Sequence, residues 1–464
     1  MIRAGLRCVA AGAAVLLAAG PTAWAVSPPV VDPTAQPPSG STGPVAPMTQ
    51  RGECIITGLT PVFAAAAVPT GQTMLNVPGA WRFSRGEGQT VAVIDTGVQP
   101  GPRLPNVDGG GDYVGKTDGL TDCDGQGTMV AGIIAGQPGD DGFAGVAPAA
   151  RVLSIRQTSR MFSPSAPAED QAAAQARIDI ASLARAVVRA ADEGARVIHI
   201  SAVTCLGTDS TIDQATLGAA LRYAALDKDA VIVAAAGNTG PGGGTGGPAC
   251  QSNPLNNVGP SEDPRNWAGV GSISAPSWWQ PYVLSVGSLT PQGQPSAFTM
   301  AGPWVGIAAP GQDIVSVSNA PDGGLANGVP NNRNELAAVH GSSYAAAYVS
   351  GVAALVRSRF PEMRAAQVVE RLTATAHNGA HTPSNLVGAG TVDAVAALTW
   401  QLPVPAAGDQ PPTRIAAPVD PEPANHLPRN VAFGGTAALV LAVAVTALVV
   451  QRRRQESPGE ERVR

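Results

Sequence analysis

The sequence predicts an α/β fold: a three-layer α/β/α domain with a mainly parallel sheet, followed by one C-terminal transmembrane helix. Three observations lead to this fold class. Short apolar runs alternate with segments of helical periodicity between residues 82 and 400. These runs are apolar almost throughout, as in parallel strands that helices cover on both faces. Residues 431–450 form an uncharged stretch that is long enough to cross a bilayer.

Residues 1–25 are predicted to be an export signal. Arg3 and Arg7 supply a positive start, residues 9–20 form an apolar stretch, and residues 23–25 read Ala-Trp-Ala, a small-x-small cleavage site. The alternative is a signal anchor that stays in place. We favour cleavage because the apolar run is too short for a bilayer of about 30 Å.

Residues 26–81 are predicted to form an N-terminal extension. Its first part, to about residue 50, is rich in Pro, Ser, Thr and Gly, so we expect no regular structure there. Its second part, residues 51–81, carries Cys54 and several apolar residues. We expect this second part to lie against the main domain.

The main domain, residues 82–400, is predicted to alternate strands with helices. Its strands are the apolar, β-branched runs at residues 90–94, 151–155, 196–201 and 230–236. Its helices are the periodic or Ala-rich runs at residues 127–136, 170–193 and 211–226. The first helix is expected to begin at Thr128, and Gly194 is expected to end the second.

Three polar residues lie at or just beyond the carboxyl ends of predicted strands. They are Asp95, Ser201 and Asn238. In parallel sheets, active residues gather at the carboxyl ends of the strands. The sequence therefore predicts a functional site at this edge of the sheet.

A proline-rich linker and a membrane anchor are predicted after the domain. Residues 401–428 are rich in proline, which favours an extended, semi-rigid spacer. Residues 431–450 suit a transmembrane helix, and three arginines follow at 452–454. The positive-inside rule places the tail, residues 451–464, in the cytoplasm and the preceding domain outside the cell membrane. A buried core helix is the alternative, but only a charged tail follows this stretch.

Charge and cysteine usage narrow the class of protein further. The net charge of −5 leaves no basic footprint for nucleic acid, so we expect no such partner. Cys8 leaves with the signal, and the four remaining cysteines suggest two disulfides with three connectivities open. We choose Cys54–Cys123 and Cys205–Cys250, because each cysteine then has a partner within reach in the predicted fold. Free buried thiols are the alternative.

Three segments carry candidate chemistry. Residues 91–98 read Val-Ala-Val-Ile-Asp-Thr-Gly-Val, residues 125–132 read Gly-Gln-Gly-Thr-Met-Val-Ala-Gly, and residues 341–346 read Gly-Ser-Ser-Tyr-Ala-Ala. In this order they resemble the Asp, His and Ser segments of the subtilisin-like (S8) serine proteases. Asp-Thr-Gly also occurs in aspartic proteases, but the chain has no matching second motif.

The resemblance implies a role for four residues. Asp95 and Ser343 correspond to the catalytic aspartate and the nucleophile, and Asn238 corresponds to the asparagine of the oxyanion hole. Gln126 stands where the catalytic histidine is expected. The serine motif also departs from the family, which usually has Gly-Thr-Ser and a proline at the position of Ala347.

Two further segments are similar to the mycosins, the membrane-anchored S8 proteases of type VII secretion. Residues 145–148 read Gly-Val-Ala-Pro, and residues 153–159 read Leu-Ser-Ile-Arg-Gln-Thr-Ser. The layout of signal, Cys-bearing extension, protease domain, linker and anchor agrees. The resemblance implies a protein or peptide substrate and membrane components of a type VII secretion complex as partners.

Gln126 decides between three hypotheses. A glutamine amide donates to Asp95 and accepts from Ser343, but it has no usable proton affinity near neutral pH. The first hypothesis is a pseudoprotease with a structural role in the secretion complex. The second is an active endopeptidase that uses His340 or a substrate histidine, although His340 would approach Ser343 from the wrong side for Asp95 to orient it. The third is a non-catalytic module that holds a peptide in the cleft by strand addition.

Neither the histidine of the third predicted strand nor a metal or cofactor site is assigned a catalytic role. His199 lies inside an apolar strand and is interpreted as a core residue. No cofactor is expected, and we predict no metal site. The resemblance leaves a structural calcium open, but no carboxylate cluster has the spacing of a calcium loop.

Overall fold

The computed structural model describes residues 26–61, 68–166, 168–240, 250–255, 263–331, 333–379, 384–402 and 427–455. The predicted signal peptide, most of the predicted linker and the end of the tail lie outside these residues. The chain divides into two units, residues 1–402 and 403–464, and each is described by itself.

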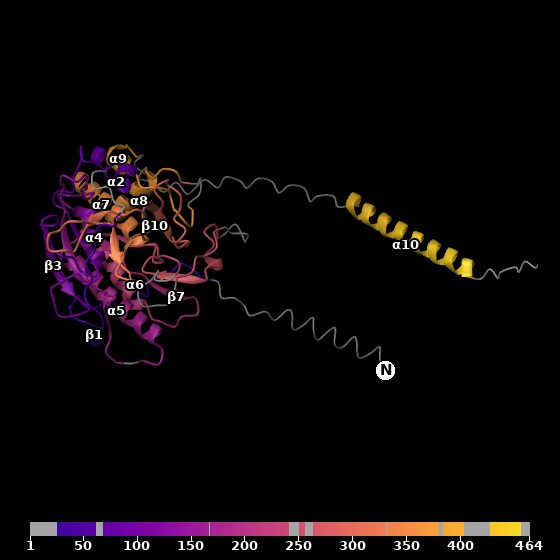
Figure 1. The fold of residues 1–464 in the computed structure, drawn as a ribbon, viewed down its shortest axis with the longest axis horizontal. Helices are drawn as coiled ribbons and strands as arrows, with labels where there is room; N and C mark the ends of the chain where they lie inside the picture. The colour runs from indigo at the N-terminus through magenta and orange to yellow at the C-terminus, as the bar shows by residue number, and fades with distance from the viewer. Residues whose placement is uncertain are drawn as a thin grey trace, which may run out of the picture. The chain divides into compact units, whose positions relative to one another are not determined.

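A seven-stranded parallel sheet forms the centre of the first unit (Figure 1). Its order is β11-β10-β8-β6-β2-β4-β3, and every neighbouring pair is parallel. The strands are β2 (Thr90–Asp95), β3 (Val107–Asp112), β4 (Arg151–Arg156), β6 (Val197–Ile200), β8 (Val231–Ala235), β10 (Val283–Leu289) and β11 (Val305–Pro310). The predicted parallel sheet is confirmed, and the four predicted strands are β2, β4, β6 and β8.

Helices cover both faces of this sheet. One face carries the helices α2 (Thr70–Met74), α3 (Val77–Ala80), α4 (Gln126–Ala135), α7 (Ser342–Arg359), α8 (Ala365–Ala374) and α9 (Ala394–Thr399). The other face carries α5 (Gln171–Asp192) and α6 (Ala215–Arg222), which continues as a π-helical turn, η1 (Tyr223–Asp227). Figure 1 shows α5 and α6 on the side opposite α7 and α8.

Strand periodicity explains these two apolar cores. Successive side chains of a strand point to opposite faces of the sheet. Along β2, Val91 and Val93 pack with α4 and α7, whereas Ala92 and Ile94 pack with α5 and α6. Both faces are buried, so the strand is apolar at residues 91–94, between its first residue, Thr90, and its last, Asp95. This pattern confirms the three-layer prediction.

Small two-stranded sheets lie around the central one. They are β1 (Met48–Gln50) with β5 (Phe162–Pro164), β7 (Thr204–Gly207) with β9 (Ser272–Ala275), β12 (Ser316–Val317) with β13 (Leu325–Ala326), and β14 (Gly328–Pro330) with β15 (Leu336–Ala338). A 3-10 turn, η2, spans Trp267–Gly269.

Two predicted helix starts were wrong. α4 begins at Gln126 instead of Thr128, because a loop carboxylate holds its first turn, as described below. α6 begins at Ala215 instead of residue 211. Asp213 accepts a hydrogen bond from the backbone N–H of Ala215 (2.8 Å). Such a local turn competes with the helix and delays its start.

The expectation of no regular structure over residues 26–50 was wrong in part. β1 at the end of this segment pairs with β5 of the main domain. Earlier, the backbone N–H of Gly43 donates to the carbonyl of Asp112 (2.7 Å), and the Tyr113 hydroxyl donates to the carbonyl of Gly40 (3.1 Å). Hydrogen bonds to the domain, and not an internal periodicity, therefore hold this segment.

The second unit contains α10 (Leu427–Gln455). Its window Gly435–Arg452 is long and apolar enough to cross a membrane, judged by length and composition. The prediction of one apolar C-terminal helix over residues 431–450 agrees with this element.

Candidate active site

Asp95 ends β2 and is fully buried at the carboxyl edge of the sheet. Its Oδ1 accepts hydrogen bonds from the backbone N–H of Thr96 (2.7 Å) and from Nε2 of Gln126 (3.2 Å). Its Oδ2 bonds to the hydroxyl of Ser201, which follows the neighbouring strand β6. Parallel strands that end at one edge thus bring Asp95 and Ser201 together. None of these three partners carries a charge.

A second buried carboxylate organises the start of α4. One oxygen of Asp122 accepts from the hydroxyl of Thr96 (2.8 Å) and from the backbone N–H of Gly125 (2.8 Å). The other oxygen accepts from the backbone N–H (2.8 Å) and the hydroxyl (2.6 Å) of Thr128. The first N–H groups of a helix have no partner within the helix, and Asp122 satisfies one of them. It therefore fixes the turn that presents Gln126 to Asp95.

Ser343 lies in the first turn of α7, which begins at Ser342 after Gly341. Asn238 accepts from the backbone N–H of Ser342 through Oδ1 (2.9 Å), and the hydroxyl of Ser342 accepts from the backbone N–H of Gly237 (3.2 Å). These two bonds tie the loop after β8 to the start of α7. A methyl group added to Gly341 would lie 3.3 Å from both Asn238 Nδ2 and Ser343 Oγ. The amide donor and the hydroxyl therefore face the same small space.

This arrangement suits the stabilisation of an oxyanion. The amide of Asn238 offers an N–H donor beside Ser343. The start of α7 adds backbone N–H groups without partners within the helix, and its dipole favours negative charge there. The structure thus places the Ser343 hydroxyl beside hydrogen-bond donors that could stabilise an oxyanion.

In the part of the chain that the structure describes, Gln126, at the position of the expected base, is not linked to Ser343 in the way that Asn238 and α7 are linked to each other. The amide of Gln126 donates to Asp95 (3.2 Å), but among the described residues no hydrogen bond joins Gln126 to Ser343. The sequence allowed Gln126 to link both residues, and the structure shows only the link to Asp95. Within the described ranges, the hydroxyl of Ser343 therefore has no hydrogen-bond acceptor at the position where a base would take its proton.

Gln126, Asn238 and Ser343 line one cleft of about 570 Å³. His340 also lines this cleft, and its ring packs against Phe298 with ring centroids 4.8 Å apart. In the described part of the chain, His340 forms no hydrogen bond with Ser343. The structure therefore brings three of the four predicted site residues to one cleft, leaves Asp95 buried behind Gln126, and places His340 at the wall of the cleft.

Burial controls the electrostatics behind the cleft. Burial raises the pKa of Asp95 to about 7, against the opposing effect of the hydrogen bond with Ser201, and the charges of Asp122 and Asp124 raise it further. Burial also raises the pKa of Asp122 above its usual value. Burial lowers the pKa of His199 to about 3. A buried carboxylate without a cationic partner favours its neutral form.

The sequence analysis missed the polar network behind Asp95. His199 is a buried residue of β6, as expected, but its ring contacts the hydroxyls of Ser201 (2.8 Å) and Ser350 (3.0 Å). Ser350 lies 151 positions further along the chain, so no local pattern could pair it with His199. Asp122 gave a weak signal, since it precedes the Gln126 motif in a turn-rich segment.

The two disulfides join Cys54 to Cys123 and Cys205 to Cys250, the pairs that the sequence analysis chose. Cys123 lies three residues before Gln126. The backbone of Cys250 forms a parallel β-bridge with that of Thr239, the residue after Asn238. Each disulfide therefore lies beside a different part of the cleft.

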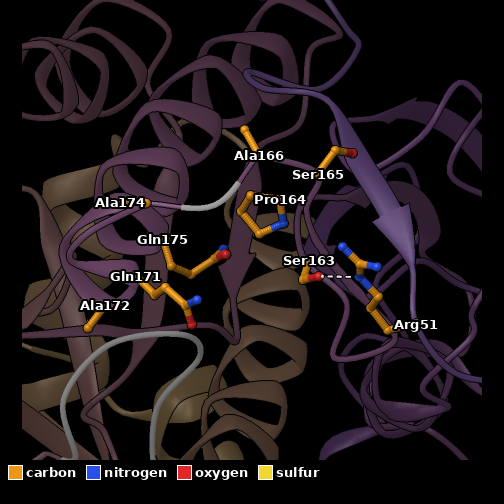
Figure 2. Close-up of a pocket in the computed structure, with 10 residues that line it drawn as sticks. Arg51, Ser163, Pro164, Ser165, Ala166, Gln171, Ala172, Ala174 and Gln175 are labelled. Atoms are coloured by element: carbon orange, nitrogen blue, oxygen red, sulfur yellow. Dashed lines mark hydrogen bonds between the residues drawn. The ribbon is translucent and has the colours of Figure 1, made fainter.

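A second cavity, of about 670 Å³, lies between β5 and the start of α5 (Figure 2). Its lining is mostly small or uncharged, with Gln171 and Gln175 on the helix side. Arg51 donates from Nε to the hydroxyl of Ser163 (3.0 Å) at its edge. Among the described residues, the cavity shares no lining residue with the cleft and holds no nucleophile paired with a base.

No group of three or more His, Cys, Asp or Glu side chains is arranged to hold a metal ion within the described ranges. The expectation about calcium stays a prediction.

Known proteins match the chain over most of its length. The sequence model of the subtilase family matches residues 86–390. Mycosin-3 of Mycobacterium tuberculosis is 62% identical over 459 residues, which are 98% of this chain and 99% of that protein. Mycosin-1 of Mycolicibacterium smegmatis is 44% identical over 454 residues, which are 95% and 98% of the two chains.

Solved structures agree with these matches. The MycP3 protease from the type VII (ESX-3) secretion system has a TM-score of 0.78 at 67% identity, over 81% of this chain and 100% of that one. A chain of an intact ESX-5 inner membrane complex has a TM-score of 0.78 at 44% identity, over 92% of this chain and 100% of that one.

Proposed function

For this chain, which belongs to the subtilase family of serine proteases and within it to the mycosins of type VII secretion, we propose that Gln126 has removed or severely weakened catalysis. We further propose that a structural role in the membrane secretion complex remains. The observation that carries this proposal is the amide at the base position. It donates to Asp95 and forms no hydrogen bond with Ser343 in the described structure.

The chemistry explains why one side chain has so large an effect. A serine hydroxyl attacks a peptide carbonyl only when a neighbour takes its proton. An amide does not take a proton near neutral pH. In subtilisin, loss of the histidine lowers kcat by about 2 × 10⁶, which corresponds to roughly 8–9 kcal/mol. The Asn238 side of the cleft would retain only the share of catalysis that oxyanion stabilisation and binding supply.

The structural role has separate support. A relative in an ESX-5 inner membrane complex covers 92% of this chain at 44% identity. The window Gly435–Arg452 is suited to anchor the protein beside such membrane components. The positive-inside rule then puts the arginines after this helix in the cytoplasm and the cleft outside the membrane, where it faces protein or peptide substrates.

Labelling of Ser343 by a fluorophosphonate tests the loss of catalysis in the full chain. We expect slow labelling of the natural chain and a rise of at least about 10³-fold in Gln126→His, because the histidine restores the base. Ser343→Ala should abolish labelling in both backgrounds. A natural chain that labels as fast as Gln126→His would overturn the proposal.

Native-gel analysis of the membrane complex tests the structural role. The Ser343→Ala chain should enter a complex of the same size as the natural chain does, because assembly does not use the nucleophile. Disassembly in this variant would contradict a role that is independent of catalysis.

Access to a membrane-impermeant maleimide in intact cells tests the orientation. A cysteine introduced as Ser39→Cys, in the exposed extension, should be labelled. A cysteine introduced as Ser457→Cys, in the tail, should be protected. The reverse result would invert the proposed topology.

A further inference from the structure

A continuous chain of four buried hydrogen bonds runs from Asp95 into the core. Oδ2 of Asp95 bonds to the hydroxyl of Ser201, which bonds to Nε2 of His199 (2.8 Å). Nδ1 of His199 bonds to the hydroxyl of Ser350 (3.0 Å), which donates to the carbonyl of Ala346 (2.9 Å). The chain joins β2, β6 and α7, and its four side chains are all buried.

When Asp95 is ionised, this run of four hydrogen bonds has one hydrogen atom too few. Each of the four bonds needs one hydrogen. The hydroxyls of Ser201 and Ser350 supply one each, and a neutral imidazole at His199 supplies one more. An ionised carboxylate supplies none. Three hydrogens would then serve four bonds, and one buried polar contact would be left without a hydrogen, which is unfavourable.

The fourth hydrogen has two places to lie, on His199 or on Asp95. A charged imidazolium at His199 would stand in the dry core, and burial lowers the pKa of this ring to about 3. Burial acts on Asp95 in the opposite sense and raises its pKa to about 7. A hydrogen on Oδ2 of Asp95 satisfies all four bonds with no charge in the chain, and the Ser201 bond then runs from the acid to the hydroxyl.

We propose that Asp95 holds a proton on Oδ2 as a neutral acid, and that His199, locked in the Nδ1–H tautomer between Ser201 and Ser350, is the positioning residue that keeps it there. Asp95 donates to Ser201, Ser201 donates to Nε2 of His199, Nδ1–H donates to Ser350, and Ser350 donates to Ala346. The other oxygen, Oδ1, still accepts from Gln126. This inference concerns the proton behind the cleft and does not depend on whether catalysis is lost.

The carboxylates nearest Asp95 favour the same state. Two cations also lie near: Arg156 is the register partner of Asp95 on β4 but pairs with Asp112 (3.5 Å), and Arg160 acts on Tyr344. Asp122 and Asp124 face Asp95 from the loop before α4, and their negative charges oppose ionisation. Tyr344 on α7 also faces Asp95, and burial keeps its pKa well above the usual value, so it is neutral. Gln126 on α4 is uncharged. In the described part of the chain, His199 takes part in no ion pair with β2, β8 or α7.

The tautomer of His199 tests the proposal directly. The full chain, in detergent micelles and labelled with ¹⁵N in its histidine rings, is followed by long-range ¹H–¹⁵N correlation from pH 6 to pH 9. At pH 6 we expect the neutral Nδ1–H pattern for His199. As Asp95 loses its proton, with a midpoint near 7, the Nε2 resonance should shift. A doubly protonated ring or an Nε2–H tautomer at pH 6, or spectra that do not change with pH, would overturn the proposal.

Variants separate the chain of bonds from a general effect of pH. Asp95→Asn keeps an N–H donor toward Ser201, so His199 should stay in the Nδ1–H form from pH 6 to pH 9 with no shift. Ser201→Ala breaks the bridge and should also remove the shift. Ser285→Ala is a matched control, because Ser285 is a buried serine on the sheet whose hydroxyl has no hydrogen-bond partner among the described residues, and it should leave the shift unchanged.

Assignment and folding are checked in the same samples. The His199 signal is identified by its loss in His199→Asn or, if that variant does not fold, by through-bond correlation to its backbone. Melting temperature and amide spectra establish that each variant is folded. A shift that persists with the same midpoint in folded Ser201→Ala would show that the proton of Asp95 is not coupled to His199 through Ser201.

Discussion

The two sides of the cleft use their buried polar groups in opposite ways. On the serine side, which comprises Asn238, Gly341, Ser342 and Ser343, an amide donor and a hydroxyl face open space. On the aspartate side, which comprises Asp95, Asp122, Gln126 and Ser201, both oxygens of each carboxylate are bonded within the protein. The serine side is thus arranged for a ligand, while the aspartate side is arranged for its own stability.

This difference separates geometry from reactivity. A cleft keeps the shape of a protease site when its nucleophile and oxyanion donors are held by backbone contacts, such as those between the Asn238 loop and α7. Reactivity needs in addition a group that changes its protonation state next to Ser343. Asp95 and His199 lie one layer deeper than Ser343, and their hydrogen-bond chain runs into the core and not toward Ser343.

The largest expected effect on stability concerns the disulfide on the aspartate side of the cleft. Cys54–Cys123 closes a separation of 69 residues, and Cys205–Cys250, beside Asn238, closes one of 45. Chain-entropy arguments give about 4 kcal/mol for a loop of either size. We expect Cys54→Ser with Cys123→Ser to lower the free energy of unfolding of the full chain by this amount in denaturant titrations. The paired Cys205→Ser and Cys250→Ser variant is the matched comparison.

The two disulfides also allow a test of whether the two sides of the cleft are stabilised independently. If they are, either loss should leave the unfolding midpoint shifted by a similar amount. A large shift of the unfolding midpoint on loss of one disulfide, and none on loss of the other, would show that a single disulfide stabilises both sides of the cleft.

The next effect tests the donors of the serine side. In the Gln126→His background, Asn238→Ala should slow peptide hydrolysis about 10²- to 10³-fold, roughly 3–4 kcal/mol, because the amide no longer stabilises the oxyanion. Asn331→Ala is the matched control, since Asn331 is an exposed asparagine that lines the same cleft. Equal losses in both variants would mean that Asn238 acts through cleft shape alone.

A smaller effect distinguishes the sides by their response to pH. The pKa of Asp95 is raised to about 7 in the folded protein from an ordinary value of 3.8, so the folded state binds the proton more tightly than the unfolded state does. Stability from this group is therefore greatest below pH 4 and declines as pH rises to about 7, with a slope of at most about 1.4 kcal/mol per pH unit. We expect Asp95→Asn to flatten this decline in unfolding measurements from pH 4 to pH 8.

Ser343→Ala is the control for this measurement, because the serine side contributes no group that titrates in this range. Its pH profile should run parallel to that of the natural chain. Profiles of the natural chain and Asp95→Asn that are parallel to each other would contradict a proton held at Asp95.

The same contrast explains which features the sequence could predict. The interior of β2, residues 91–94, is apolar and the strand ends in Asp95, so the burial of the strand and the place of Asp95 at the edge of the sheet follow from the sequence itself. The positions of Asn238 and Ser343 follow from family motifs. The network behind Asp95 does not, because Ser201 and Ser350 meet His199 and Asp95 across three separate elements. The attachment of residues 26–50 was missed for a similar reason, since a few hydrogen bonds to the domain leave no period in the sequence.

The smallest expected effect concerns His340. Its ring packs against Phe298 at the wall of the cleft and forms no hydrogen bond with Ser343 in the described chain. A base must lie within hydrogen-bond reach of the proton that it removes, directly or through one water. Ser343 labelling in His340→Ala should therefore stay within about twofold of the natural chain, since loss of a true base would cost orders of magnitude. Phe298→Ala, which removes the packing partner, controls for a change in cleft shape. A fall of tenfold or more in His340→Ala, with Phe298→Ala unchanged, would instead make His340 the base of an active protease and would join the two sides of the cleft into one catalytic site.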